Sequence, residues 1–347
     1  MDKKLILSVA GSGKTSYIIN NLNEEERFLI ITYTNGNTKN IKEKVIKKFG
    51  YIPQNVTIQT YHKFIFSFCI MPFLGYTKKI KGLYFNNYRD LPKKKLEDEE
   101  RYMTKQRKLY SDRLAQYIKQ EKMIPEVLQR IEKYYDSFYI DEVQDFAGHD
   151  FDFLLELTNV RIKMEMVGDF NQHTYKTSVD GNKNINLFSS YENYKTRFTN
   201  KNIIIDEKTL EKSFRVSEEV CSFLVKNLGL SIESHKKVEG KIELIENNED
   251  ITKIIERNDI IKLFYKNSSK YKCYSQNWGD SKGIDKYDEV CVILNPKTMK
   301  LYKSNELIKL VSETKSKFYV ACTRARSKLY FIEQAKIKKF LKSDYQK

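Results

Sequence analysis

A short glycine loop near the N-terminus constrains the fold of this chain more than any other feature. The loop follows an apolar run at residues 5–9 and consists of Ala10, Gly11, Ser12, Gly13, Lys14 and Thr15. A helical pattern begins directly after it. Backbone N–H groups at such a helix start point at phosphate oxygens, the lysine reaches the outer phosphates and the threonine hydroxyl binds Mg²⁺. The order strand, loop, helix therefore predicts a phosphate-binding loop, although Ser8 stands where the pattern usually has glycine; the alternative is a glycine turn beside a surface lysine.

Further apolar runs alternate with helical patterns along the whole chain. After residues 5–9, the candidate strands are residues 27–32, 56–59, 138–140, 163–167, 203–205, 242–245, 260–264, 289–294 and 329–332. Strands that alternate with helices form parallel sheets covered on both faces. The sequence thus predicts an α/β fold.

Changes in composition suggest how the chain is divided. Residues 75–135 are rich in Lys and Tyr, with a mostly helical pattern from Glu97 onward, and residues 177–202 are polar and rich in Asn. We expect a first lobe made of residues 1–74 and 136–200, interrupted by a helical subdomain at 75–135. The second lobe would comprise residues 201–347, with residues 203–205 as its first strand.

The charge of the chain points to a polyanionic partner. Sixty-two Lys and Arg against 46 Asp and Glu give a formal net charge of +16, which favours nucleic acid, although a lysine-rich surface would look similar. The five cysteines lack the close paired spacing of a zinc site or disulfide framework, which suggests reduced thiols in a cytoplasmic protein. We expect no signal peptide and no membrane role, because the apolar runs are too short.

An acidic pair further along the chain has the residue types that bind Mg²⁺ and activate water in phosphoryl transfer. Asp141 and Glu142 directly follow the apolar run at residues 138–140. An Asp at the carboxyl end of a parallel strand can hold Mg²⁺, and the neighbouring Glu can orient and deprotonate an attacking water. The alternative is an acidic helix start, which the helix dipole alone would favour.

Several further segments, in order, resemble the motifs of superfamily 1 helicases of the UvrD, Rep and PcrA group. In addition to the loop and the acidic pair, these are residues 32–35 (TYTN), 57–64 (TIQTYHKF), 167–175 (VGDFNQHTY), 210–215 (LEKSFR), 281–285 (SKGID) and 318–326 (FYVACTRAR). The resemblance implies two RecA-like lobes that use ATP and Mg²⁺. It departs from the family at residues 281–285, where the upstream His is missing, and in the short spacing before them, which implies a reduced second-lobe insertion.

The resemblance also assigns roles to individual residues. Gln172, Arg215 and Arg324 would meet the γ-phosphate, Phe214 would stack on adenine and Asp285 would contact the ribose. The implied nucleic-acid contacts are Tyr33, Thr34, Asn35, Thr60, Tyr61, His62 and Tyr175. Aromatic residues next to strands are often part of the core instead, so each tyrosine has that alternative.

Three hypotheses follow for the function. The first is an ATP-dependent translocase or helicase that acts on single-stranded DNA or single/double-strand junctions, with 3′ to 5′ polarity implied by the resemblance. The second is a nucleic-acid-stimulated ATPase that serves as motor or sensor of a repair or phage-defence complex, with a protein partner. The third is an ATP-gated clamp without turnover, which the complete set of reactive residues disfavours. Nothing in the sequence distinguishes DNA from RNA.

Overall fold

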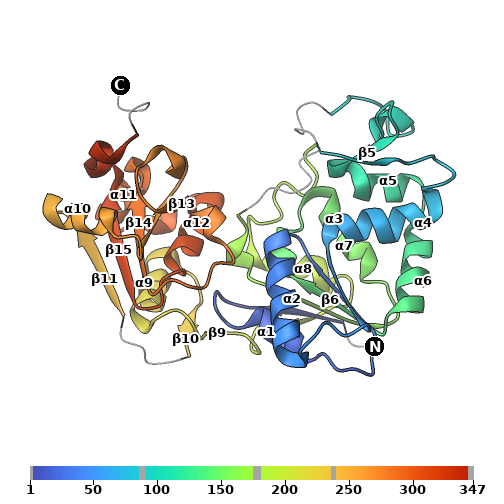
Figure 1. Ribbon diagram of the computed structural model, residues 1–347, viewed down its shortest axis with the longest axis horizontal. Helices are drawn as coiled ribbons and strands as arrows, with labels where there is room; N and C mark the ends of the chain where they lie inside the picture. The colour runs from blue at the N-terminus through green and yellow to red at the C-terminus, as the bar shows by residue number, and fades with distance from the viewer. Residues whose placement is uncertain (1–2, 86–90, 175–180, 236–239, 343–347) are drawn as a thin grey trace. The chain divides into compact units, whose positions relative to one another are not determined.

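The computed structural model describes residues 3–85, 91–174, 181–235 and 240–342 (Figure 1). The chain forms two compact units. The first contains residues 1–6, 14–168 and 176–206, and the second contains residues 7–13, 169–175 and 207–347. Each unit is built on its own sheet, and the strand pairs within each sheet that are described below are parallel.

The first unit contains a six-stranded sheet with the order β3-β2-β6-β7-β1-β8. Its strands are β1 (Lys3–Leu7), β2 (Phe28–Thr32), β3 (Val56–Thr60), β6 (Ser137–Asp141), β7 (Lys163–Gly168) and β8 (Ile204–Asp206). The pairs β2–β3, β2–β6, β6–β7 and β1–β8 are parallel. All five residues of β2 and of β6 are buried, as expected for strands covered on both faces. The predicted α/β architecture is confirmed.

Strand β8 corrects one prediction about the sheets. Residues 203–205 were expected to open the second lobe, but Ile204 pairs in register with Lys4 of β1, so β8 is the edge strand of the first sheet. An apolar run indicates a strand but carries no information about its partner. Helix α8 (Tyr191–Thr199), inside the segment expected to be a polar boundary loop, leads the chain into this edge position.

Several helical segments of the first unit follow its strands closely in the sequence. They are α1 (Lys14–Asn20), α2 (Asn35–Phe49), α3 (Tyr61–Lys63), the π-helix η1 (Phe64–Ile70), α4 (Met71–Leu74), α7 (Gly148–Leu157) and the 3₁₀ turn η5 (Val143–Asp145). Helix α2 begins where the Thr34 hydroxyl accepts a hydrogen bond from the Asn37 N–H, and it ends at Gly50, which has a left-handed backbone (φ 84°). The sequence pattern alone indicates a helix over residues 38–49, and the Thr34 cap extends it by three residues at its start.

The segment expected to be a helical insertion is less helical than predicted. Strands β4 (Gly82–Tyr84) and β5 (Lys108–Tyr110) form a short parallel pair, and α5 (Leu114–Gln120) and α6 (Ile124–Tyr134) follow. Between Glu97 and α5 the chain makes only β5 and the 3₁₀ turns η3 (Glu99–Arg101) and η4 (Ser111–Arg113). The buried Arg113 donates to the carbonyls of Pro92 (2.9 Å) and Arg101 (2.6 Å), and such tertiary hydrogen bonds outweigh a helical pattern.

The second unit contains a five-stranded parallel sheet with the order β11-β15-β14-β12-β13. Its strands are β11 (Lys241–Ile245), β12 (Ile261–Phe264), β13 (Ser275–Asn277), β14 (Glu289–Leu294) and β15 (Lys328–Glu333), with β9 (Lys212–Ser213) and β10 (Glu233–Ser234) as a separate short pair. Its α-helices are α9 (Glu218–Leu228), α10 (Asn248–Glu256), α11 (Pro296–Lys303) and α12 (Ser312–Cys322). The 3₁₀ segments of this unit are η6 (Phe170–Gln172), η7 (Ser268–Lys270), η8 (Gly279–Ser281), η9 (Leu307–Lys309) and η10 (Gln334–Phe340). Strand β13 was not predicted, because the polar sequence Ser-Gln-Asn lacks an apolar pattern.

A buried aromatic cluster holds α12 in place. Trp278 is fully buried, its indole N–H donates to the carbonyl of Leu263 (2.9 Å), and its ring packs on Phe318 of α12. Phe318 stacks in turn on Phe331 of β15. These contacts fix the helix whose other residues reach the candidate site. In the described part of the chain, none of the helices has the length and apolarity to cross a membrane.

Candidate nucleotide-binding site

The glycine loop has the backbone geometry of a phosphate cradle. It connects β1 to α1, and Gly11 and Gly13 adopt left-handed φ values of 72° and 88°, which glycine reaches without strain. The buried hydroxyl of Ser12 makes no hydrogen bond within the described residues. Lys14 is buried at the first turn of α1. The Ser12 hydroxyl, next to the start of α1, is therefore placed to donate a hydrogen bond to a phosphate.

Asp141 and Thr15 meet as the spacing of the motifs requires. Thr15 Oγ1 donates to Asp141 Oδ2 (3.2 Å), and Asp141 is only 2% exposed at the end of β6. Burial raises the pKa of Asp141, the neighbouring Glu142 raises it further, and Lys14 and Thr15 oppose the shift. A buried carboxylate beside a hydroxyl is a hard oxygen donor set, so these two residues fit Mg²⁺, with phosphate and water oxygens as further ligands.

Glu142 has a strained backbone. Its φ of 58° and ψ of 48° are left-handed, a conformation that costs a non-glycine residue of order 1 kcal/mol and that concentrates at functional sites. The fully buried Gln144 donates from Nε2 to the Glu142 carboxylate, so a neighbour on the same turn orients the predicted base. Gly168 is required here, because a Cβ at that position would lie 2.6 Å from Val143 Cγ1. Sequence reasoning missed Gln144, although it lies in the same short motif.

A second cluster joins three motifs within the second unit. The Ala10 N–H donates to the Tyr319 hydroxyl (3.0 Å), which itself donates to Asp169 Oδ2 (3.0 Å). Gln172 Nε2 donates to the same Asp169 oxygen (2.9 Å). Asp169 and Tyr319 are fully buried, and burial beside Asp169 raises the pKa of Tyr319 well above its ordinary value. Gln172 is therefore oriented by Asp169, and Tyr319 links the phosphate loop to both; neither Tyr319 nor Asp169 was singled out from the sequence.

Replacing Tyr319 with phenylalanine is expected to lower the free energy of unfolding of this unit. The change removes one hydroxyl and leaves the buried Ala10 N–H and a lone pair of Asp169 without it, at about 1–3 kcal/mol. Urea unfolding measures the effect. Tyr330→Phe is a matched control, because the Tyr330 hydroxyl makes one longer, partly buried bond to Glu289 (3.3 Å). Equal stability of the two variants would contradict the link.

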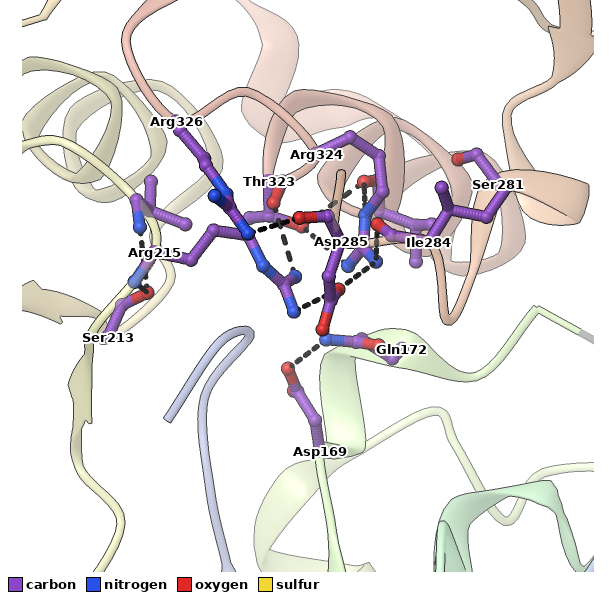
Figure 2. Close-up of polar contacts among 12 residues, drawn as sticks. Asp169, Gln172, Ser213, Arg215, Ser281, Ile284, Asp285, Thr323, Arg324 and Arg326 are labelled. Carbon is purple, nitrogen blue, oxygen red and sulfur yellow. Dashed lines mark hydrogen bonds and ion pairs between the residues drawn. The ribbon is translucent and has the colours of Figure 1, made fainter. Parts of the chain in front are cut away.

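Arg215 and Arg324 come together on the second unit (Figure 2). Arg324 is 2% exposed; its Nε donates to the carbonyl of Val320 (3.0 Å) and its Nη1 to that of Ile284 (3.2 Å). Arg215 donates from Nη1 to the carbonyl of Thr323 (3.4 Å). Two of the hydrogen bonds of Arg324 thus go to backbone carbonyls, and the side chain of Arg215 is 13% exposed against 2% for Arg324.

The segment that carries Arg215 packs on the phosphate loop. The Phe214 N–H donates to the carbonyl of Gly11 (2.9 Å), and a Cβ at Gly11 would lie 2.6 Å from Arg215 Cβ and 2.8 Å from Ser213 Oγ. Only glycine allows this approach. Phe214, the predicted adenine platform, is 57% exposed and stacks on His235 with ring centroids 4.2 Å apart, so it can still offer surface to a base.

Asp285 has a different environment from the one expected. Its carboxylate forms ion pairs with Arg215 and, at 3.7 Å, with Arg324. The group assigned to ribose by resemblance is therefore engaged by both arginines. The isolated motif could not indicate this, because these three residues are far apart in the sequence.

The predicted nucleic-acid contacts separate into surface and core. Tyr61 is 2% exposed, donates to Asp150 Oδ1 (2.8 Å) and stacks on Tyr33, so it has the core position that was the alternative to a base platform. Tyr33 and His62 are partly buried, and burial lowers the pKa of His62. The other predicted contacts comprise the capping residues Thr34 and Thr60, the exposed Asn35, and Tyr175, which lies outside the described residues.

Two family models match the chain, each over half of it or more. An "AAA domain" matches residues 2–178, and a "viral superfamily 1 RNA helicase core domain" matches residues 93–333. This chain belongs to the superfamily 1 helicases. The placement confirms the superfamily expected from the motifs, and the matches do not single out the UvrD, Rep and PcrA group.

Solved helicases of arteriviruses share the fold of this superfamily 1 helicase. Arterivirus nonstructural protein 10 (helicase) in complex with DNA is 15% identical with a TM-score of 0.50, covering 98% of this chain and 63% of that one. A further crystal structure of arterivirus nonstructural protein 10 (helicase) is 12% identical with a TM-score of 0.50, covering 98% of this chain and 62% of that one. The helicase of PRRSV has 12% identity and a TM-score of 0.48, with 96% and 52% covered.

These similarities concern the fold. This superfamily 1 helicase spans between about half and two thirds of the length of those viral chains. At 12% and 15% identity, the likeness to arterivirus nonstructural protein 10 supports the two-lobed α/β fold alone. Comparison with curated proteins finds no match. Members of the superfamily hydrolyse nucleoside triphosphates and act on nucleic acid.

Proposed function

We propose that this helicase hydrolyses ATP with Mg²⁺ and uses the energy to move along single-stranded DNA in the 3′ to 5′ direction. The observation that carries the proposal is the packing of the Arg215 segment directly on Gly11 of the phosphate loop. An arginine beside a phosphate cradle is suited to neutralise charge that develops during phosphoryl transfer. The polarity comes from the resemblance to the UvrD, Rep and PcrA motifs.

Each reactive residue has one task in this proposal. Lys14 and the loop amides hold the phosphates, and Thr15 with Asp141 would hold Mg²⁺, which neutralises charge on the phosphate oxygens. Glu142, oriented by Gln144, takes a proton from the attacking water. Gln172 and the arginines would contact the γ-phosphate. ATP binding and hydrolysis would thereby change the conformation of the protein and its affinity for the DNA strand.

Two alternatives rest on particular observations. RNA is a candidate polymer because the family model that covers most of the chain describes viral RNA helicases. A motor or sensor role in a repair or phage-defence complex is a candidate because the described residues between Arg215 and Lys282 form α9, α10, short strands and two 3₁₀ turns rather than a large helical insertion. Such a protein would need a partner for unwinding.

Steady-state ATPase activity with single-stranded DNA, duplex DNA, RNA or no polymer tests the proposal. Single-stranded DNA should give the largest stimulation, and a duplex with a 3′ overhang should be unwound faster than one with a 5′ overhang. Greater stimulation by RNA would favour the RNA alternative. ATPase activity without unwinding on either overhang would favour the motor or sensor role.

Binding to single-stranded DNA is expected to weaken steeply as salt rises. Lys and Arg contacts to phosphates release counterions, whereas stacking on an aromatic ring contributes about 1–3 kcal/mol per base and is less salt-dependent. Tyr33→Ala should therefore weaken binding about tenfold without changing the salt slope, as fluorescence anisotropy would measure. Tyr76, which is 95% exposed, supplies the control Tyr76→Ala. A binding constant that is indifferent to salt would contradict the charge argument.

A further inference from the structure

Asp285 is placed as a shared counter-ion for the two candidate arginines. Its side chain is 51% exposed, whereas those of Arg215 and Arg324 are 13% and 2% exposed. Its own backbone carbonyl accepts a hydrogen bond from Arg326. The hydrogen bond from Arg326 holds the backbone of Asp285, and the carboxylate points toward two guanidinium groups from different segments of the second unit (Figure 2).

The remaining hydrogen bonds described for these arginines go to neutral acceptors. Arg324 donates to the carbonyls of Val320 and Ile284 and to the Thr323 hydroxyl (3.4 Å), and Arg215 donates to the Thr323 carbonyl. Neutral acceptors satisfy hydrogen bonds without opposing the pair of Arg215 with Asp285. A further anion that reached Arg215 would therefore compete with the Asp285 carboxylate.

We propose that Asp285 sets the preference between nucleoside triphosphate and diphosphate by competing with the γ-phosphate for Arg215. The inference rests on the proposed function, because it requires a nucleotide at the phosphate loop against which Arg215 packs. A triphosphate must exchange the pair between Arg215 and Asp285 for one between Arg215 and the γ-phosphate. A diphosphate lacks the competing group and leaves the pair intact. Asp285 therefore opposes triphosphate binding selectively.

The half-exposed position of Asp285 makes such an exchange feasible. Solvent can take up the displaced carboxylate, whereas the buried Arg324 stays bound to backbone carbonyls. Partly exposed ion pairs are worth at most about 1 kcal/mol, which corresponds to a severalfold change in affinity. A change in affinity of this size can be measured as a ratio between variants, and the loss of one such ion pair should leave the fold intact.

Binding of ATPγS and ADP to wild type and Asp285→Asn tests the inference by calorimetry. The asparagine keeps the shape and removes the charge, so affinity for ATPγS should rise about two- to fivefold while that for ADP stays unchanged. Asp285→Glu keeps the charge and should retain a ratio of the two affinities near that of wild type. If the asparagine variant does not fold, Asp285→Ser serves in its place.

Other results would overturn the inference in distinguishable ways. An unchanged ratio of ATPγS to ADP affinity in the neutral variant would refute competition at Arg215. Equal losses for both nucleotides, together with weaker wild-type binding of 2′,3′-dideoxy-ATP than of ATP, would instead indicate a ribose contact. If wild type bound neither ATPγS nor ADP, the proposed function itself would fail.

Discussion

Lys14→Ala is expected to abolish nucleotide turnover, whereas Glu142→Gln should leave ATP bound but unhydrolysed. Lys14 is buried at the start of α1 and would hold the outer phosphates, so its loss removes binding. Glu142 would act on water, so its loss removes the chemical step alone, at least about 10²-fold in kcat. The first variant should therefore fail to bind ATP, and the second should bind ATP without hydrolysing it.

Equilibrium binding of labelled ATP and steady-state hydrolysis, measured on the same preparations, separate the two effects. Lys47→Ala is a control because this lysine is exposed in the last turn of α2, away from the loop. Near wild-type hydrolysis by Glu142→Gln would exclude Glu142 as the base. Gln144→Ala should then be compared, since its amide orients the Glu142 carboxylate.

Arg215→Ala should fold normally, bind ATP and lose most polymer-stimulated hydrolysis. Arginine fingers in phosphoryl transfer contribute about 10³ to 10⁵ in rate, on the order of 4–7 kcal/mol of barrier. A surface ion pair is worth less than about 1 kcal/mol, so loss of the Asp285 pair alone cannot produce such a decrease. Arg215→Lys should be a poor substitute, because lysine lacks the planar fork.

The same substitution at Arg324 is expected to affect stability as well. Arg324 is buried and donates to two backbone carbonyls, so alanine would leave both acceptors unsatisfied at about 1–3 kcal/mol each. Thermal unfolding must therefore accompany the ATPase assay for both variants. Arg257→Ala, which removes ion pairs of a half-exposed arginine with Asp259 and Glu289, is the control. Undiminished turnover in Arg215→Ala would refute the role of that arginine.

The sequence determined the local elements whose signals lie within a few residues. The strand, loop and helix around Gly11 and Lys14, most of helix α2 and the position of the acidic pair after β6 follow from apolar runs, helical patterns and the loop glycines. The proximity of Thr15 and Asp141 was also expected, because Asp141 ends β6 and Thr15 lies in the first turn of α1, directly after the loop that follows β1 of the same sheet.

Only the tertiary structure decided which distant groups share an environment. It placed β8 beside β1, buried Tyr61 against Asp150, joined Ala10 to Asp169 through Tyr319, and brought Asp285 to both arginines. Strand partners, burial and ion pairs depend on contacts between residues far apart in the chain, and a local pattern of apolar and polar residues is compatible with many such contacts.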